Sequence, residues 1–509
     1  MPETAFGIDF GTTNTRVAYF DGTKPIMVPV EDRGGRRFYE IPSVVGYLNG
    51  EPISFGHDAI DNDAVTSVKS IKWQLDRENP IDLGKGYWVE SLNVAEAFFR
   101  YLRDVVKNSE LQERNLSRAS ITVPVNFPYR SRENLCKACE NAGIEVAHIF
   151  QEPVAALYCQ IARGAHSSTA AVFDWGGGTL DVATVQVGQG WAQVKVQDGL
   201  RVGGDNFDRI IGLRALMQFL ADYPDIRRSP EELLEDPQRG PKILQLAENV
   251  KRRLGERYVD HYLWGDFLPN RNIMCDVRRE DFEAWIEQDI ERGIACLKRA
   301  IRRTGVPDSM VNPILLSGGT CHIPLIQQRL LQEFGPTHIR RNLPFAEDEK
   351  DYNPVQDISN ATAIGAALLA VFGAEPVFSS DLGIRTADAT TSEDGFYPVF
   401  RKGSALEFGK KHERFFVSNP SMGVARVLIC DRLDPDLQPQ GLLRRIVPIP
   451  IDRKESWIDV YFELTRHLGL KVYGSGEIRP CEREETETFI HDLNLGFKIP
   501  ELAQEAFLA

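Results

Sequence analysis

Two aspartates of this sequence each stand just before a glycine-rich turn. Asp9 precedes the turn at residues 11–14, and Asp174 precedes the turn at residues 176–179. Glycine in such a turn lets successive backbone N–H groups point at phosphate oxygens with no side chain in the way. Two carboxylates facing each other beside these turns could hold a hydrated Mg²⁺, an ion that keeps most of its waters. The pattern therefore predicts a site for a phosphorylated ligand.

Each turn lies between two apolar runs that predict the strands of a β-hairpin, and the second copy follows the first by about one domain's length. The runs are residues 6–10 and 17–20, and residues 171–174 and 180–185. A third glycine turn follows the apolar run at residues 314–316. One such hairpin alone would be an ordinary tight turn. Three turns, two of them matching in strand, Asp and Gly/Thr positions, favour a duplicated unit that forms a nucleotide cleft.

The surrounding sequence predicts the elements that would position this cleft. Helical stretches at 93–107 and about 131–142 enclose a strand at 119–123, which is an α/β pattern. A mainly helical region is expected over 210–303, and a small-residue helix over 361–370. From residue 375 onward, short β-like runs separated by turn residues predict an all-β sandwich.

The composition excludes several other classes of protein. The chain has 509 residues, 42% of them hydrophobic, a formal charge of −14 and a pI near 5.3. Without a stripe of Lys and Arg, nucleic acid is not expected as a partner. No signal peptide or membrane span is expected, and eight scattered cysteines fit a reducing compartment, so we expect a cytoplasmic protein. The one close pair, Cys136 and Cys139, is expected to pack on a helix face and not to bind a metal.

The motifs, taken in order, resemble those of the heat-shock protein 70 (DnaK-type) chaperones. The resemblance covers about residues 6–370 and is weaker beyond them. It rests on residues 7–14 (GIDFGTTN), 151–156 (QEPVAA), 173–182 (FDWGGGTLDV), 203–208 (GGDNFD), 248–252 (ENVKR) and 318–324 (GGTCHIP). The resemblance implies a two-lobed actin-like (ribonuclease H-like, duplicated) ATPase domain whose lobes close on MgATP, followed by a β-sandwich domain. Residues 381–386 (DLGIRT) resemble the opening of that second domain.

The domain boundaries expected on this basis are 1–373 for the nucleotide-binding domain, 374–480 for the β-sandwich and 481–509 for a short tail or helix. Within the first domain, lobe I covers about 1–168 and lobe II about 169–373. After Gly474 about 35 residues remain, which leaves no room for the family's helical lid. The stretch 372–378 contains Gly and Pro in place of the family's leucine-rich interdomain linker, so we expect altered coupling between the domains.

By motif position, the resemblance also implies a role for each candidate site residue. Asp9 and Asp174 would hold Mg²⁺, with K⁺ as a further candidate ion. Glu152, Asp174 and Asp181 would contact metal-bound water or orient the attacking water. The phosphate and adenosine contacts would come from Gly11, Thr12, Thr13, Asn14, Gly176, Gly177, Gly178, Thr179, Gly203, Gly204, Asp205, Glu248, Lys251, Arg252, Gly255, Gly318, Gly319, Thr320 and His322.

A lysine is expected to steady the terminal phosphate or the attacking water, as a point charge. Spacing in the motif SVKSIK favours Lys69, and Lys72 is the competing candidate. Two departures from the family pattern lie at the adenosine side. His322 stands where an arginine usually stacks on adenine, and Gly255 stands where a serine often contacts the base. Both predict altered nucleotide affinity.

These expectations favour a slow ATPase of the chaperone type that binds ATP and ADP. Its client would be a polypeptide segment or a dedicated protein partner, with a J-domain co-chaperone and a nucleotide exchange factor as further candidate partners. A nucleotide-switched scaffold or filament-forming actin-like protein is the alternative. A small-molecule kinase of the same superfamily is a weaker one, because it would need a second substrate pocket.

Overall fold

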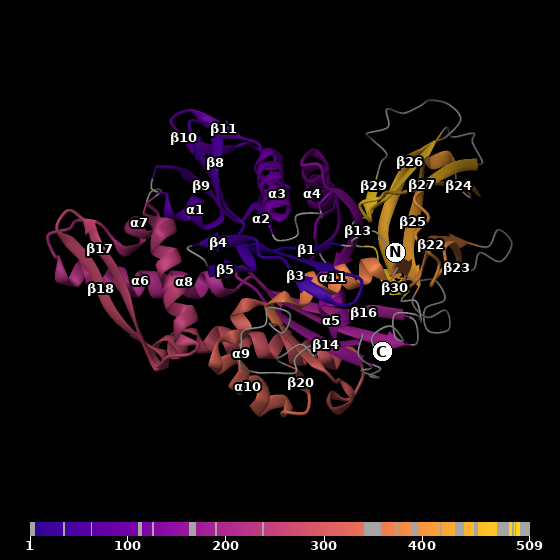
Figure 1. The fold of residues 1–509 in the computed structure, drawn as a ribbon. Coiled ribbons are helices and arrows are strands. Elements are labelled where there is room, and N and C mark those ends of the chain that lie inside the picture. The colour runs from indigo at the N-terminus through magenta and orange to yellow at the C-terminus, as the bar shows by residue number, and fades with distance from the viewer. Residues whose placement is uncertain are drawn as a thin grey trace. The chain divides into compact units, whose positions relative to one another are not determined.

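The computed structural model describes most of the chain. The described residues are 6–33, 36–62, 64–109, 115–124, 127–161, 169–188, 191–236, 239–340, 358–372, 374–387, 394–417, 420–432, 442–451, 457–475, 488–490, 493 and 495–498. The chain divides into two compact units, drawn in Figure 1. Unit 1 comprises residues 1–187, 194–372 and 502–509, and unit 2 comprises residues 188–193 and 373–501. No helix of the described residues is long and apolar enough to span a membrane.

The first half of unit 1 is built on a mixed sheet with the strand order β13-β12-β1-β2-β3. The strands are β1 (Phe6–Phe10), β2 (Asn14–Phe20), β3 (Pro25–Met27), β12 (Arg118–Val123) and β13 (Glu145–Gln151), and β6 (Glu40–Pro42) pairs with β2. Strand β1 runs parallel to β12 and antiparallel to β2. Its side chains are almost all buried, as expected for a central strand covered on both faces.

A second sheet of unit 1 repeats this arrangement. Its central strand β14 (Thr169–Trp175) is antiparallel to β15 (Leu180–Gly188) and parallel to β19 (Ile314–Ser317). In register, Asp9 lies beside Thr122 of the parallel neighbour, and Asp174 lies beside Ser317. The carboxylate therefore has a hydroxyl residue beside it in both copies, which extends the duplication predicted from the sequence.

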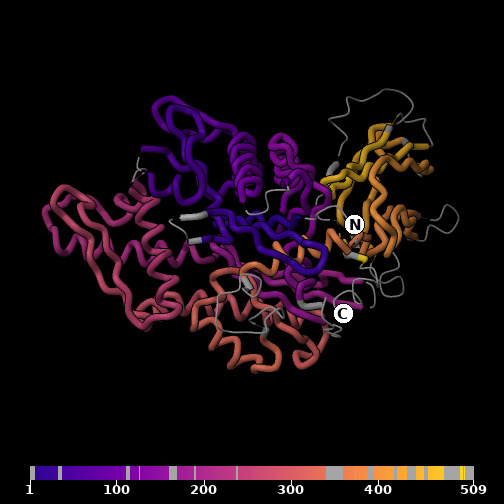
Figure 2. Tube along the Cα trace, viewed as in Figure 1, coloured from indigo at the N-terminus to yellow at the C-terminus, as the bar shows by residue number. Residues whose placement is uncertain are grey.

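Helices pack on the two sheets in both halves of unit 1. In the first half these are α1 (Gly56–Asp61), α2 (Ile71–Gln74), α3 (Ser91–Asn108), α4 (Tyr129–Asn141) and α5 (Glu152–Ile161). In the second half they are α6 (Gly204–Asp222), α7 (Pro230–Leu234), α8 (Gly240–Leu254), α9 (Arg279–Arg303), α10 (Pro324–Phe334) and α11 (Ala361–Val371). Figure 2 traces the first half in indigo to purple and the second half in magenta to orange. The cysteine pair Cys136 and Cys139 is buried on α4.

Shorter strands complete unit 1. They are β4 (Glu31–Arg33), β5 (Arg36–Phe38), β7 (Val45–Leu48), β8 (Glu51–Phe55), β9 (Thr66–Val68), β10 (Ile81–Gly84), β11 (Tyr87–Val89) and β20 (Ile339–Arg340).

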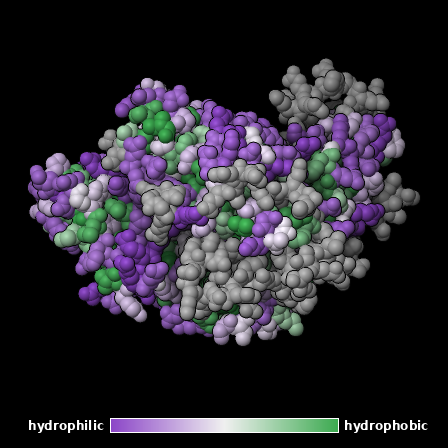
Figure 3. Space-filling view, in the orientation of Figure 1, coloured by the Kyte–Doolittle hydropathy of each residue, from purple (hydrophilic) through white to green (hydrophobic). Residues whose placement is uncertain are grey.

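The region 210–303, predicted as mainly helical, also contains a β-hairpin of β17 (Val259–Leu268) and β18 (Arg271–Arg278). Burial alternates along much of β17, but the apolar residues do not, since Val259 and Leu263 are exposed and Asp260 is buried. No period-two hydrophobic pattern therefore marks this strand in the sequence. The outer face of this hairpin exposes Leu263 (53%) and Met274 (70%), which are paired across the strands. Hydrophobic side chains accordingly appear on this part of the otherwise mostly hydrophilic visible surface in Figure 3.

The described part of unit 2 is mainly β-strand, with one short 3-10 helix at Pro420–Met422. One sheet has the order β23-β22-β25-β26 and another has the order β24-β27-β28-β29. In addition, β30 pairs with β21 on one side and with residues 191–193 of β16 (Trp191–Leu200) on the other. The strands are β21 (Glu375–Phe378), β22 (Asp381–Ala387), β23 (Asp394–Phe400), β24 (Gly409–Phe416), β25 (Val424–Arg432), β26 (Leu442–Pro450), β27 (Trp457–Leu464), β28 (Leu470–Ser475), β29 (Thr488–Ile490) and β30 (Leu495–Lys498).

Two of these elements fall on segments for which the sequence analysis made specific predictions. The linker-equivalent stretch contributes the strand β21. The expected tail or helix at 481–509 lies mostly outside the described residues, and its described part contains β29 and β30.

The small-residue helix α11 packs closely against neighbouring backbone. A Cβ atom placed on Gly365 would lie 1.7 Å from the carbonyl oxygen of Ala155 on α5. Helix α11 also packs against β1, where a Cβ atom placed on Gly7 would lie 2.3 Å from the carbonyl oxygen of Ala363. These contacts are between backbones, so no flexible side chain can move to make room.

We therefore predict that Gly365→Ala lowers the free energy of unfolding by about 3 kcal/mol or more, because overpacking a rigid contact forces backbone shifts. Gly265→Ala is the matched control, since nothing lies within 4 Å of the new Cβ and no left-handed backbone is required there. Urea unfolding monitored by circular dichroism measures both changes. Equal stability of the two variants would contradict the packing described for α11.

Candidate functional site

Four carboxylates from both halves of unit 1 form a cluster in which each affects the ionisation of others. Asp9 is the second-to-last residue of β1, Glu152 begins α5, and Asp174 faces Asp181 in the antiparallel register of β14 and β15. The side chains of Asp9 and Glu152 are only 13% and 12% exposed. The structure therefore brings the predicted metal ligands and the predicted water-orienting residues together.

The ionised cluster is electrostatically strained. Burial, followed by repulsion from Glu152, raises the pKa of Asp9 and of Asp181 to about 6 in each case. Burial, followed by Glu152, Asp9 and Asp181, also raises the pKa of Asp174. Hydroxyl groups offset part of this cost, since Thr179 Oγ1 donates to Asp181 at 2.7 Å.

Lys72 is the lysine that enters this cluster. Its Nζ donates to Glu152 Oε1 at 2.5 Å, and its side chain is 3% exposed. Its charge lowers the pKa of both Asp9 and Asp181. The ammonium group also lies 5.6 Å from the ring centroid of Phe127. The competing candidate from the sequence thus lies among the carboxylates.

Lys69 lies in another part of the cleft. Its Nζ donates to the backbone oxygen of Pro241 at 3.4 Å. Burial lowers the pKa of Lys69, and the charges of Glu248, Asp205 and Asp208 act against this shift. Lys69 therefore lies near Glu248 and Asp205, which are predicted nucleotide contacts, and its charge is not among the causes of the pKa shifts of Asp9, Asp174 and Asp181.

A sequence signal could have pointed to Lys72. Ile71 and Leu75 are apolar at the i, i+4 spacing of one helical face, and both are buried. Lys72 follows Ile71 directly and precedes Leu75 by three residues, so it lies at the edge of that buried face. A lysine in such a position has to be neutralised by a partner, and Glu152 provides the carboxylate.

The two glycine-rich turns after Asp9 and Asp174 meet in the cleft. A Cβ on Gly177 would lie 1.9 Å from Thr13 Oγ1, so only glycine fits there. Thr13 Oγ1 donates to Asp205 at 3.2 Å. At the first turn, Ser43 Oγ donates to the backbone oxygen of Gly11 at 2.8 Å, which fixes this turn against the next segment.

Two further glycine turns close on the same place. A Cβ on Gly203 would lie 2.2 Å from the backbone oxygen of Gly177. Thr320 Oγ1 donates to the backbone oxygen of Gly176 at 2.9 Å. The backbone around Gly319 is open, with no atom within 4 Å of the position of a Cβ. The turns predicted from separate parts of the sequence therefore converge.

Helix α8 provides the predicted adenosine-side residues. Lys251 Nζ donates to Asp208 Oδ2 at 2.8 Å and to the backbone oxygen of Gly204 at 3.1 Å. Burial opposes ionisation of Glu248, but Arg252 and Lys251 outweigh it and lower the pKa of this carboxyl group. The Glu/Lys/Arg face is therefore tied to the glycine turn before α6 and is not a freely solvated stripe.

A pair of ionic contacts that the sequence analysis missed connects the two halves of unit 1. Glu40 on β6 accepts from Arg16 and, at 2.6 Å, from Arg252 on α8. Arg16 Nη1 also lies 3.9 Å from Asp9 Oδ2. The contacts therefore run from the carboxylate cluster to the adenosine side. Because Glu40 and Arg252 are 212 residues apart, no local pattern reveals them.

The two departures from the family pattern lie beside each other. The position of a Cβ on Gly255 is 3.8 Å from the backbone oxygen of His322. The imidazole Nε2 of His322 lies 3.1 Å from Ser359 Oγ, within hydrogen-bonding distance. Neither residue provides the planar guanidinium that an arginine at position 322 would bring.

The donor chemistry of the cleft fits a magnesium–nucleotide complex. Four carboxylates meet two nearby cations, Lys72 and Arg16, so the cluster has an excess of negative charge. A divalent ion would relieve the repulsion that raises the pKa values. Asp9 and Asp174 are the residues that would hold such an ion, and the glycines of the adjoining turns have no side chains that would obstruct a phosphate.

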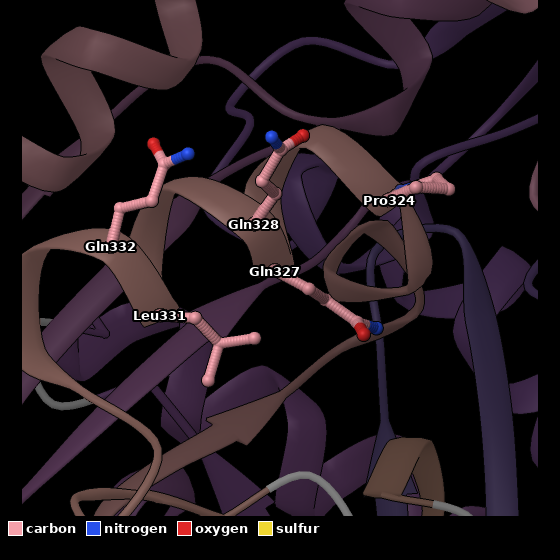
Figure 4. A pocket seen from close by; sticks show the side chains of 5 residues that line it. All are labelled: Pro324, Gln327, Gln328, Leu331 and Gln332. Carbon is pink, nitrogen blue, oxygen red and sulfur yellow. The ribbon is translucent and has the colours of Figure 1, made fainter.

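Of two cavities in the described residues, one lies at this site and the other lies elsewhere. A small cavity of about 30 Å³ is lined by Glu152, Asp174 and Asp181 together with Pro124 and Asp198, among others. This volume is enough for one water molecule. A larger hollow of about 440 Å³ lies along α10 and is shown in Figure 4. Its lining consists of Pro324, Leu331 and three glutamines, and it includes no predicted site residue.

We predict that Asp181→Asn stabilises the ligand-free protein at pH 7.5 by about 1 to 2 kcal/mol, because it removes a charge that the cluster repels. Burial and then the charge of Glu152 raise the pKa of Asp181 from 3.8, the ordinary value expected in the unfolded chain, to about 6, so the folded state binds more protons between these values. The free energy of unfolding therefore falls as pH rises through this window, and the penalty is complete above about pH 6. The advantage of the variant should disappear near pH 4.

Urea unfolding of both proteins between pH 4 and 8 measures this difference. A variant that is less stable than the wild type at pH 7.5, or an advantage that does not change with pH, would contradict the electrostatic description.

Comparison with known protein families agrees with this geometry. Residues 54–370 match the family described as Hsp70 protein, which is more than half of the chain. The match includes α2, the second and third glycine turns and the helix α8. It confirms the predicted two-lobed, actin-like fold with a following β-sandwich, and it supports a nucleotide-binding, chaperone-type function in general. The chain belongs to the heat-shock protein 70 family.

Proposed function

We propose that unit 1 binds MgATP and hydrolyses it slowly, and that the bound nucleotide sets the affinity of unit 2 for a polypeptide segment or a dedicated protein partner. The observation that carries this proposal is the carboxylate cluster at Asp9, Glu152, Asp174 and Asp181, with Lys72 inside it and phosphate-type turns beside it. The bound nucleotide can control client binding by unit 2 only if the ATP-bound and ADP-bound states of the chain differ in their affinity for the client.

In this proposal the residues of the cluster act mainly by position and charge. The cavity lined by Glu152, Asp174 and Asp181 would hold the attacking water. The water oxygen bonds to the terminal phosphorus as the bond to the bridging oxygen breaks, and the water proton passes to a carboxylate or to the released phosphate. Mg²⁺ held near Asp9 and Asp174 would neutralise charge on the phosphates. Lys72 would hold positive charge beside the terminal phosphate.

Asp181 is suited to accept a proton. Its pKa of about 6 lies close to neutral pH. A general base with such a pKa is largely deprotonated at neutral pH and still basic enough to accept a proton. Asp174 faces it across the hairpin and would remain near the metal ion.

Other parts of the proposal come from family membership. A J-domain co-chaperone and an exchange factor are proposed as partners, and the cytoplasm as the location. A nucleotide-switched scaffold remains the alternative function, and ATP-dependent sedimentation in an ultracentrifuge would support it.

We predict that Lys72→Ala lowers single-turnover ATP hydrolysis by about 100-fold, because a charge at the reacting phosphate is lost. Lys69→Ala is the matched control, since this lysine contacts Pro241 and lies near the adenosine-side acids. Asp174→Asn should also abolish turnover. A larger loss of hydrolysis in Lys69→Ala than in Lys72→Ala would show that Lys69, the residue favoured by the sequence spacing, acts at the terminal phosphate. Normal turnover in all three variants would contradict the site.

For the client, we predict that an extended fluorescent peptide binds the full chain more tightly with ADP than with ATP, or the reverse, by about tenfold, which corresponds to about 1.4 kcal/mol of coupling. Fluorescence anisotropy with each nucleotide measures this ratio. A panel of unrelated peptides that binds in neither state would contradict general chaperone activity and leave the dedicated partner as the proposal. Equal affinities in both states would contradict coupling.

A further inference from the structure

The short helix α2 and the residue before its N-cap direct three side chains to three parts of the site. Lys69 reaches Pro241, Lys72 reaches Glu152, and Trp73 lies beside the second phosphate turn. Ser70, which precedes the helix, has a left-handed backbone with φ of 52°. A left-handed non-glycine residue costs roughly 1 kcal/mol, so the surrounding contacts must fix it.

Hydrogen bonds on both sides of α2 provide this support. Gln74 Nε2 donates to the backbone oxygen of Lys69 at 2.8 Å. Asn134 Nδ2 on α4 donates to the backbone oxygen of Leu75 at 2.6 Å. The beginning and end of the turn are therefore both fixed, and with them the direction in which Trp73 extends.

The indole nitrogen of Trp73 lies at the junction of the two phosphate turns. The position that a Cβ on Gly178 would occupy is 3.6 Å from Trp73 Nε1 and 3.4 Å from Thr12 Cγ2. Thr12 belongs to the first turn and Gly178 to the second. Within the described part of the chain, the indole N–H of Trp73 has no hydrogen-bond acceptor. The side chain is 42% exposed, so it borders open space.

The same place is where the terminal phosphate of a bound nucleotide would lie. Thr179, next to Gly178, donates to Asp181 of the carboxylate cluster. Lys72, next to Trp73, pairs with Glu152 of that cluster. A phosphate between these groups would lie against the glycine turn and within reach of the indole. A neutral N–H donor there would add a hydrogen bond to an ionised acceptor, which is stronger than one between neutral groups.

We propose that Trp73 donates its indole N–H to the terminal phosphate of ATP and thereby makes the site distinguish ATP from ADP. This rests on the proposed function, because it needs a nucleotide in the cleft. Trp73 would then be a specificity-determining residue in addition to the lysine and the carboxylates.

The test compares Trp73→Phe with the wild type. Phenylalanine keeps an aromatic ring but removes the N–H group. Isothermal titration calorimetry gives the dissociation constants of MgADP and of the magnesium complex of an ATP analogue with an imido bridge. We expect the preference for the analogue over ADP to fall by about tenfold in the variant, within the range for a hydrogen bond to a charged group. ADP affinity should stay within about twofold, which also shows that the variant is folded.

Trp88→Phe is the matched control, because Trp88 lies on β11 in the same half of unit 1 and is 61% exposed. It should leave both affinities unchanged. A second readout uses tryptophan fluorescence, since the analogue should change the wild-type emission by more than ADP does, and Trp73→Phe should remove that difference.

An unchanged preference in Trp73→Phe would overturn the inference while leaving the proposed function intact. Equal losses of ADP and analogue binding would also overturn it, because they would indicate a structural role. A wild-type chain that binds neither nucleotide would overturn both the inference and the proposed function.

Discussion

The candidate site of unit 1 is dominated by four carboxylates that lie close together. The strands β1, β14 and β15 and the helix α5 each contribute one of them. Asp9 and Asp174 occupy equivalent positions in two duplicated hairpins, and Glu152 repels both. In the described residues, Lys72 is the one lysine whose ammonium group pairs with a carboxylate of this cluster. Burial and mutual repulsion raise the pKa values of Asp9, Asp174 and Asp181, and shifts of this kind are typical of functional sites. The metal ion of a metal–phosphate complex would relieve this repulsion.

The remaining features of the cleft follow from this constraint. Glycine is required at 177 and 203 because the turns that would surround the phosphates approach each other to within a side chain's width. Glu40 holds Arg16 near Asp9 and also pairs with Arg252 on α8. The charge of the cluster is thereby connected to the adenosine side. Closure of the two halves around a nucleotide would change the same contacts.

Much of this could be predicted from the sequence, for physical reasons. The strand, Asp and glycine-turn order is local, and glycine at a crowded turn has few alternatives, so the fold class and the convergence of the turns were predictable. The side chains that depend on long-range packing were not. Lys69 and Lys72 are three residues apart, and the sequence distinguishes them only by the apolar, buried positions Ile71 and Leu75 beside Lys72.

The Glu40 contact with Arg252 and the position of Trp73 against Gly178 join distant segments and have no local pattern. The hairpin β17–β18 was missed for a different reason. Its apolar residues do not alternate with polar ones, since Val259 and Leu263 are exposed and Asp260 is buried, and long helices flank it on both sides.

The most direct test of the central claim is thermal unfolding of the full chain with Mg²⁺ alone, with ATP plus EDTA, and with MgATP. A ligand that binds only the folded state stabilises it by mass action, by about 2.7 kcal/mol at 100 times its dissociation constant. If the carboxylate cluster is built for a magnesium–nucleotide complex, MgATP should raise the unfolding midpoint clearly more than either component alone. An unfolding midpoint that is the same under all three conditions would contradict the account.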